Sequence, residues 1–449
     1  MSTYPVRTSW RALAGRTLAV ACIAASVQGG ARSAHAHPFD LFGYGSRATA
    51  MGNAYTALAD GYEASYYNPA GVVGGSDVRT GFGYLQTFSD LSLNGQALEL
   101  KETKLGAFVA GVSASGEMGG RGAGLSIGLL LPNEGAIRAS SLEPLQPNYV
   151  LLTNRTQRAE ILFTGGLELL PGLDLGAGFT LGAELGGDVS IEATTFPATV
   201  AGSGTIEIGA RFFPIVGLRW TPREHLKVGL TYRGEAEFPL RIPAAINLLV
   251  VPGSELGADL VLLVEQPYYY TPQQVAAGIG WDPSSDWTVS ADLVWWNWSA
   301  AEDPGVRGAL EVSGPLAALL PLPTIQAPVD PNFHDIITPR VGVEWRPPRT
   351  PFGLAAVRAG YGYEPTPAPK PIGAQNLLDS DKHIIGAGLG FRFRDPWGIL
   401  RKDADLDLHG QYFHFAHREA LKVDPSDPIG DLVFGGDRWT AGAMLTIHF

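Results

Sequence analysis

Alternation of apolar and polar residues is the main pattern of this chain from about residue 77 to its end. In the last segment, Trp439, Ala443 and Leu445 share one parity, while Arg438 and Thr446 take the other. A repeat of two residues is typical of a β-strand whose two faces meet different surroundings. The pattern therefore predicts an all-β protein, with one strand face suited to lipid and the other polar or small.

About fourteen segments carry this alternation, and an even number of strands suits a closed antiparallel barrel. Every second connection is short, as at 171–173 and 283–286, whereas those at 239–270, 299–335 and 365–380 are long. Short turns on one side and long loops on the other are typical of outer-membrane barrels. We therefore predict a transmembrane antiparallel β-barrel over residues 77–449, with strands at 77–88, 102–115, 121–132, 157–170, 174–186, 204–220, 225–238, 271–282, 286–298, 336–347, 353–364, 381–395, 404–416 and 436–449.

Aromatic placement separates this barrel from a soluble β-sandwich or propeller, which also has many strands and Gly-rich turns. Aromatic rings flank the aliphatic band of a membrane barrel at both lipid interfaces. Charged residues keep to the opposite parity, as expected when a lipid-facing arginine near the midplane costs roughly 2 to 4 kcal/mol. The predicted register puts Trp281, Trp287, Trp345 and Phe449 at turn ends and Trp295, Tyr361, Tyr363, Tyr412 and Trp439 at loop ends.

Composition agrees with a folded chain that has a sheltered surface. Of 449 residues, 57 are Gly and 33 are Pro, and only 17% are charged, which indicates many turns and argues against disorder. The formal net charge of −12 gives no electrostatic reason to expect a nucleic-acid partner. Cys22 is the only cysteine, so we expect no disulfide and no cysteine-based metal site.

We expect residues 1–36 to be a secretory signal peptide that is cleaved before His37. Arginines at 7, 11 and 16 precede an apolar stretch at 18–27, and small residues at 34 and 36 fit a cleavage site. The alternative is a lipoprotein signal that ends at Cys22, although no large aliphatic residue stands three positions before it. No later stretch reaches the roughly eighteen consecutive apolar residues of a membrane helix. The predicted location is the bacterial outer membrane.

Residues 37–76 lack the alternation, and we predict that they form a compact hatch ahead of the barrel. Alanines between 48 and 59 are spaced for one or two short helices, and Asn68-Pro69 favours a turn that stops a helix. Such a segment can hang below the barrel or fold into its lumen as a plug. Its low charge and small side chains favour the plug.

Residues 45–60 and the run Tyr67-Asn68-Pro69-Ala70-Gly71 resemble the N-terminal signature of the FadL-type transporters of long-chain fatty acids and other hydrophobic compounds. Stretches 271–299 and 358–393 are also similar to this family, and the C-terminal phenylalanine matches the ending read by the barrel assembly machinery. The resemblance implies a barrel of about fourteen strands closed by an N-terminal hatch. The alternative for Asn68-Pro69 is simply a turn into the first strand. The resemblance also implies a hatch or gate role for Phe39, Leu41, Phe42, Asn68, Pro69 and Ala70.

The long loops are the candidates for capture of a hydrophobic substrate. Such a molecule has to cross the polar sugar layer outside the outer membrane, and exposed apolar patches usually mark binding sites. The alternative is that the loops cover one another. We assign ligand capture to apolar residues of the loop at 239–270, namely Ile246, Leu248, Leu249, Leu260 and Leu263.

Two further groups of residues are candidates for steps of transport. A carboxylate headgroup needs a basic partner, although lumen-facing ion pairs are the alternative use of the arginines near the loop ends. The resemblance implies lateral exit through the barrel wall near its third strand, where glycines permit a bulge or weakened pairing. The headgroup candidates are Arg155, Arg158, Arg233 and Arg241, and the glycines of the third strand are Gly122, Gly124 and Gly128.

The predicted function is outer-membrane transport of long-chain fatty acids or other hydrophobic compounds, by capture at loops, hatch movement and lateral exit. A general diffusion porin is the main alternative, although a porin needs neither a hatch nor apolar loops. An enzyme is a weaker alternative because His409, His414 and His417 share no strand face and accompany no serine motif. We expect no metal or cofactor, a hydrophobic small-molecule substrate, contacts with outer-membrane lipid and lipopolysaccharide, and a monomer.

Overall fold

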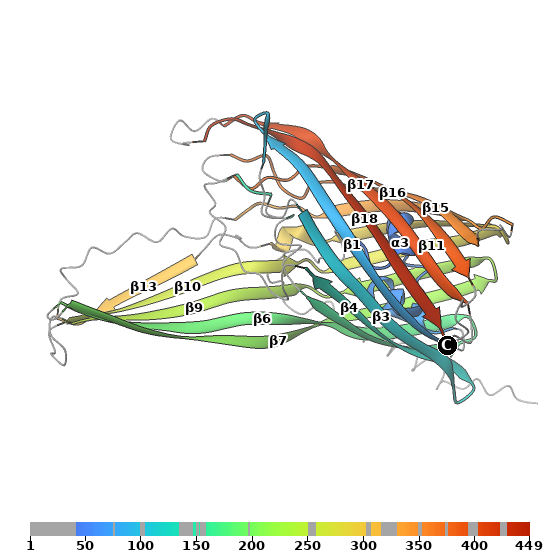
Figure 1. The fold of residues 1–449 in the computed structure, drawn as a ribbon, viewed down its shortest axis with the longest axis horizontal. Helices are drawn as coiled ribbons and strands as arrows, with labels where there is room; N and C mark the ends of the chain where they lie inside the picture. Colours follow the sequence, from blue (N-terminus) through green and yellow to red (C-terminus); the bar gives the residue numbers. More distant parts are fainter. Residues whose placement is uncertain are drawn as a thin grey trace, which may run out of the picture.

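The computed structural model forms a β-barrel, a short helical segment inside it, and a long arm of strands that projects from one end (Figure 1). Residues 1–36, the predicted signal peptide, lie outside the described part of the chain. The structure describes residues 42–74, 77–98, 104–133, 147–149, 152, 159–195, 198–249, 257–301, 307–315, 330–348, 353–372, 376–393, 403–422 and 429–449.

Fourteen strands close into a ring of antiparallel pairs, which the pairing of the first with the last completes. The predicted number of barrel strands is confirmed, and each predicted segment overlaps one strand of the ring. The short connections and the C-terminus lie at one end of the ring, the turn end, and the long connections lie at the other, the loop end. The ring consists of β1 (Val78–Leu93), β3 (Lys104–Met118), β4 (Arg121–Pro132), β5 (Glu160–Leu170), β6 (Leu173–Thr195), β7 (Ala198–Arg223), β8 (Leu226–Arg233), β11 (Gln274–Ser284), β12 (Trp287–Trp296), β14 (Ile336–Trp345), β15 (Leu354–Glu364), β16 (Lys382–Phe393), β17 (Ala404–Ala420) and β18 (Leu432–His448).

The outer surface of the ring carries the apolar band of a membrane barrel. Leu125, Leu293 and Ile385 are more than half exposed and point away from the lumen, while residues of the other parity are mostly buried. At the turn end, Trp287 and Trp345 stack with ring centroids 6.1 Å apart. Exposed aromatic residues flank the band as predicted, with Trp281, Trp287, Trp345 and Phe449 at the turn end and Tyr361 and Trp439 at the loop end.

Residues 42–74 lie inside the ring, and we call them the plug. The first helix of the plug packs against β15, β16 and β17, and its last helical turn packs against β5, β6 and β7. The predicted hatch also included 37–41 and 75–76, which lie outside the described residues. No helix in the described part of the chain has the length and apolarity needed to cross a bilayer. The helices are α3 (Ser46–Ala50), η2 (Gly61–Glu63), α4 (Ala64–Tyr67) and η3 (Pro69–Val72) in the plug and η4 (Trp298–Ala300) after β12.

Glycines on the lumen side of the strands let the plug backbone reach the wall. A Cβ added to Gly360 of β15 would lie 2.1 Å from the backbone nitrogen of Gly52. On β6, a Cβ added to Gly176 would lie 2.1 Å from the carbonyl carbon of Pro69. Atoms in a close-packed interior cannot approach so closely, so a larger residue would displace the plug. The same overlap with the plug occurs at Gly81, Gly111, Gly124, Gly128, Gly166, Gly217, Gly229, Gly342, Gly386 and Gly388.

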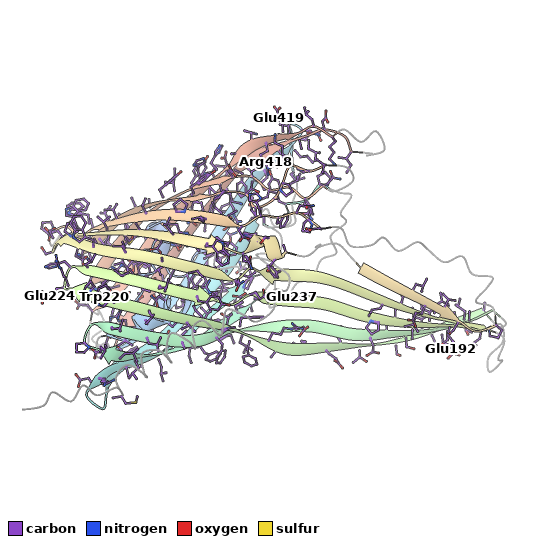
Figure 2. The ribbon with its side chains drawn as sticks, turned by 180° about the vertical axis from the view of Figure 1, so that it is seen from behind. Glu192, Trp220, Glu224, Glu237, Arg418 and Glu419 are labelled. Atoms are coloured by element: carbon purple, nitrogen blue, oxygen red, sulfur yellow. The ribbon has the colours of Figure 1, made fainter. Side chains whose placement is uncertain are left out.

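β6 and β7 continue far beyond the ring and form the arm. They have 23 and 26 residues, whereas a membrane-spanning strand needs about 9 to 11. Glu192 lies near the far end of the arm, and Trp220 and Glu224 lie at the opposite end of the molecule (Figure 2). The arm is one sheet in the order β7-β6-β9-β10-β13. It comprises residues 186–195 of β6, 198–209 of β7, and the strands β9 (Ala236–Leu249), β10 (Gly257–Thr271) and β13 (Arg307–Ser313).

The prediction of an apolar loop at 239–270 is wrong, because most of this segment forms β9 and β10. The two strands pair with each other and with β6 and β13, so they extend the sheet beyond the ring. Two short strands were not predicted either, namely β2 (Gln96–Ala97) and β13.

We expect Gly360→Ala to destabilise the protein by about 1 to 3 kcal/mol, because the added methyl group overpacks the contact between plug and wall. Thermal unfolding of the detergent-solubilised protein measures the effect. Gly410→Ala in β17 is the matched control, because an added Cβ there meets no atom within 4 Å. Equal stability of the two variants would contradict close packing of the plug.

Candidate functional site

Asn68 ties the plug to the barrel wall. Its Nδ2 donates to the carbonyl oxygens of Thr56 in the plug and Leu218 in β7, both at 2.9 Å. Its Oδ1 accepts from the backbone nitrogen of Ala70 at 3.1 Å, which caps the helical turn that begins at Pro69. Asn68 therefore holds the local turn and the wall with one buried side chain.

Asp292 of β12 is a second anchor of the plug. Its Oδ2 accepts from the backbone nitrogens of Tyr55 and Thr56, both at 2.9 Å, and from the Thr56 hydroxyl at 2.7 Å. The residue is 3% exposed. Hydrogen bonds to an ionised, desolvated carboxylate are about twice as strong as neutral ones, so this single oxygen holds one bend of the plug.

Two arginines of neighbouring strands hold carbonyl groups of the plug. Arg219 of β7 donates to the carbonyl oxygen of Ala59 at 3.1 Å and pairs with Asp174 of β6 at 2.9 Å. Arg233 of β8 donates to the carbonyl oxygen of Tyr66, and its guanidinium lies 4.0 Å from the centroid of that ring. Arg233 was a predicted headgroup partner, but the structure places it against the plug.

The lumen on the turn side of the plug is a charged cavity of about 320 Å³. Arg47 of the plug binds Glu344 of β14 through two hydrogen bonds of 2.8 and 3.0 Å. Arg358 of β15 reaches the same carboxylate at 2.7 Å, and Arg79 pairs with Asp60 of the plug at 3.0 Å. An uncharged molecule would find little apolar surface on this side.

The lumen on the loop side of the plug is rich in apolar and aromatic side chains. Phe42 at the start of the plug is buried together with Phe413, Phe415 and Phe434 of the last two strands. The Arg438 guanidinium lies 5.2 Å from the centroid of the Phe42 ring and 5.9 Å from that of Phe413. A second buried apolar cluster lies near the loop ends of β11, β12 and β14 and comprises Tyr270, Ala276, Val294, Trp296, Trp298, Ala301, Phe333, Ile336 and Ala368. Buried charges lie on this side as well, since Lys382 is 3.2 Å from Glu364 and 3.0 Å from Asp379. The plug therefore separates a half of the lumen with large apolar clusters from a charged cavity.

The residues predicted to capture ligand do not surround one pocket. They lie on β9 and β10 in the arm, and the pairing of the two strands places them on both faces of the sheet. Ile246, Leu248 and Leu260 share one face, and Leu249 and Leu263 share the other. The predicted capture site in a loop is therefore wrong, because these residues lie on two opposite faces of a β-sheet.

The glycines of the predicted lateral exit lie in a continuously paired strand. β4 pairs with β3 and with β5 without a register shift, so the expected bulge is absent from the described strand. A Cβ at Gly124 would lie 2.3 Å from the carbonyl oxygen of Val72, and one at Gly128 would lie 2.4 Å from the Tyr44 hydroxyl. A Cβ at Gly122 would lie 3.0 Å from the side chain of Val73. All three glycines therefore make room for the plug.

The remaining predicted residues divide into two groups. Arg241 lies on β9 in the arm, where its backbone stands opposite Glu265 of β10 and Gly186 of β6 in the strand register. Phe39, Leu41, Arg155 and Arg158 lie outside the described residues.

The anchoring residues Asp292, Arg219 and Glu344 were not predicted as a site. The sequence does contain a signal for them. Each is a charged residue at a strand position whose side chain points into the barrel, and a buried charge there needs a polar partner. The plug backbone is that partner. Among the described residues, no group of His, Cys, Asp and Glu is arranged to hold a metal ion.

Solved barrels share this architecture. A FadL homologue from Pseudomonas aeruginosa superposes with a TM-score of 0.57 at 14% identity, over 90% of this chain and 98% of its own. The monoaromatic hydrocarbon channel CymD gives a TM-score of 0.53 at 14% identity, over 91% and 98% of the two chains. The toluene transporter TbuX of Ralstonia pickettii gives 0.53 at 14% identity, over 92% and 100%.

The chain has the fold of the FadL-type transporters. Among curated proteins, the Alkane uptake protein A of Marinobacter nauticus is 25% identical over 278 residues, which are 62% of this chain and 57% of that protein. The chain thus spans little more than half the length of this relative. No protein-family model matches the sequence. By their names, these proteins are an uptake protein, a hydrocarbon channel and a toluene transporter.

We expect Asp292→Ala to loosen the plug, because three buried donors lose their acceptor, at a cost of about 1 to 3 kcal/mol for each unsatisfied group. Hydrogen exchange measured by mass spectrometry should show the amides of residues 55 and 56 exchanging at least about tenfold faster. Asp286→Ala, in the exposed turn before β12, should leave these amides unchanged. Unchanged protection in Asp292→Ala would show that other contacts hold this bend.

Plug stability should also fall as pH rises. Burial, with the nearby Asp60 carboxylate, raises the pKa of Glu63 in the plug from 4.5 to about 8. The folded plug therefore binds this proton more tightly than the unfolded one, so stability is highest below pH 4.5 and declines as pH rises toward 8. Hydrogen exchange of the plug at pH 6 and pH 9, corrected for intrinsic rates, should show weaker protection at pH 9. Glu63→Gln should remove most of the difference, and an equal difference in that variant would exclude Glu63 as its source.

Proposed function

We propose that this chain transports hydrophobic compounds across the bacterial outer membrane. The carrying observation is a plug fastened across the lumen, with large buried apolar and aromatic clusters on its loop side and a charged cavity on its turn side. Burial of an apolar substrate contributes about 0.8 kcal/mol per methylene group, and the apolar clusters of the loop side favour such burial. A water-filled diffusion porin has no use for this division or for a plug fastened to the wall.

We propose uncharged hydrocarbons as the first substrate class and long-chain fatty acids as the second. The curated relative is named for alkane uptake, and two of the similar structures are named for monoaromatic hydrocarbons and toluene. A fatty acid would need a basic partner for its headgroup. Arg233, a candidate for that task, already binds the plug carbonyl of Tyr66.

The proposed path enters at the loop end, passes the apolar clusters of the loop side and leaves sideways through the wall. Axial exit would take an apolar molecule through the cavity around Glu344, which is lined by several charged side chains, among them Arg47 and Arg358. Lateral exit near β4 requires two steps, because β4 is fully paired and its glycines contact the plug. The plug has to move away from Gly124 and Gly128, and a neighbouring strand has to part from β4.

A disulfide that locks the plug to the wall should abolish uptake. The hydroxyl of Ser46 in the plug lies 2.9 Å from Nδ1 of His409 in β17, so Ser46→Cys combined with His409→Cys places two thiols on side chains that face each other across the contact between plug and wall. Cells that carry the oxidised double variant should lose hexadecane uptake, and a reductant should restore it. Each single variant is a control, because it cannot form the bridge.

The same uptake assay separates the substrate classes and the porin alternative. Labelled hexadecane and palmitate are offered to cells with and without the gene, and uptake of hexadecane in preference to palmitate is expected. A large steady conductance of the intact protein in planar bilayers, together with no loss of hydrocarbon uptake on deletion, would overturn the proposal in favour of a diffusion porin.

A further inference from the structure

β7 is an edge strand along the arm. On one side it pairs with β6 over the whole length of the arm. On its other side it pairs with β8 only from Ile215 to Arg223, within the ring. Among the described elements, no strand pairs with residues 200–212 on that side, and Figure 1 shows β7 as the outermost strand of the arm. We call residues 200–212 the free edge of β7.

The free edge is open to solvent. Every residue from 200 to 210 is exposed, whichever face of the sheet its side chain points to. Val200, Ile206 and Ile208 are 77%, 80% and 70% exposed. An edge strand of this kind presents a row of backbone N–H and C=O groups with which another strand can pair. The free edge is therefore accessible to an added strand.

The free edge lacks the features that usually prevent strand pairing. Natural edge strands are protected by lysines, prolines, bulges or short length. Residues 200–210 contain Glu207 as their single charge and no proline, and their register with β6 is unbroken. The strand at the other edge of the arm, β13, has seven residues and includes Arg307 and Glu311. One edge of the arm is therefore protected, and the other can pair.

The free edge is complementary to itself in the antiparallel direction. A twofold rotation about Gly204 brings β-branched residues opposite each other and hydroxyl-bearing residues opposite each other, and such pairs stabilise neighbouring strands. The single charge then stands opposite a small residue, so no like charges meet. The opposite pairs are Val200 with Ile208, Ala201 with Glu207, Gly202 with Ile206, and Ser203 with Thr205.

The direction of β7 decides where the second copy lies. β7 runs from the far end of the arm to the turn end of the barrel, so an antiparallel partner has its barrel at the opposite end of the joint. Two copies in one membrane would need parallel strands. In a parallel ladder, a residue that bonds across stands opposite one that bonds to its other side, whereas a twofold axis along the strands puts identical residues opposite each other. Symmetric pairing of free edges therefore joins two membranes.

We propose that this chain joins two apposed outer membranes, through antiparallel pairing of residues 200–208 of one copy with the same residues of a second copy. The five strands of each arm then continue as one sheet. Five residues separate Gly204 from the root of the arm at 209, so the two barrels begin about 34 Å apart. Many copies per membrane add many such pairs, which makes the joint strong even where each pair is weak. Within each membrane the chain is a monomer, as expected from the sequence.

Tethering of proteoliposomes tests this joint. Two vesicle populations with different fluorophores are mixed, and fluorescence cross-correlation measures how many vesicles move together. We expect tethering when both populations carry the protein and none when one population is empty. Absence of tethering between protein-bearing vesicles would overturn the proposal. Equal tethering to empty vesicles would overturn it as well, because the arm would then bind lipid.

Exchange of charges at the centre of the pair tests the register. Ser203→Lys combined with Thr205→Lys puts like charges directly opposite each other and should reduce tethering at least about tenfold. Ser203→Glu combined with Thr205→Glu should also fail to tether to itself, whereas a mixture of the two variants should tether again. Glu311→Lys on β13 is the matched control, because it changes the net charge as much as the double lysine variant. Tethering that persists in the lysine variant, or that does not return in the mixture, would contradict this pairing.

A disulfide at the twofold axis gives a covalent readout. Gly204 stands opposite itself, and the Cα atoms of opposite residues in an antiparallel pair lie about 4.5 to 5.5 Å apart, within the range of a disulfide. Cys22 is the only cysteine of the sequence, so Gly204→Cys is made in a Cys22→Ala background. Mild oxidation should link copies from two populations that carry tags of different size.

Gly202→Cys is the matched control for the disulfide. In the proposed register its two thiols lie about 14 Å apart along the strands, too far to form a bridge. Heat-modifiable migration of each variant confirms that the barrel is folded. Hydrocarbon uptake should stay unchanged, because all substituted positions lie in the arm, so loss of the joint is distinguishable from loss of transport. Equal cross-linking at the two positions would indicate random collision and would reject the register.

Discussion

Backbone-to-backbone contact between the plug and the barrel wall is the constraint on which the rest of this structure depends. A lumen filled by ordinary side chains would leave no space for a chain segment with its own helical turns. Lumen-facing glycines such as Gly176 and Gly360 remove the side chain where the plug passes. Much of the glycine excess of the sequence therefore serves this one contact.

Such close contact creates a second need, because buried backbone groups have to be hydrogen-bonded. The short helices of the plug satisfy only some of their own groups. Side chains of the wall supply the remainder, with Asp292 accepting from two plug amides and Arg219 donating to a plug carbonyl. Glycine contacts and polar anchors are thus two results of placing a folded segment inside a barrel. Any movement of the plug has to exchange these bonds for others, which makes a spontaneous opening rare.

Most of the barrel was predictable because lipid imposes a simple rule on it. Around Leu293 and Ile385, which face outward, apolar and polar residues alternate strictly along the strands. Trp287 and Trp345 mark the turn end of this apolar band. The arm was not predictable in the same way, since the alternation of β6 passes the bilayer boundary without any change of parity. The role of Arg233 was out of reach as well. Its partner, the carbonyl of Tyr66, lies 167 residues earlier in the chain, and no local pattern connects the two.

β7 has a mechanical consequence that follows from its length. A single unbroken strand runs from Ala198 in the arm to Arg223 at the turn end, and on its way it offers the Leu218 carbonyl that Asn68 holds. A β-ladder is stiff along its axis, so a force applied to the far end of the arm is delivered to this bond rather than absorbed by a flexible joint. The arm is therefore mechanically connected to the plug through β7.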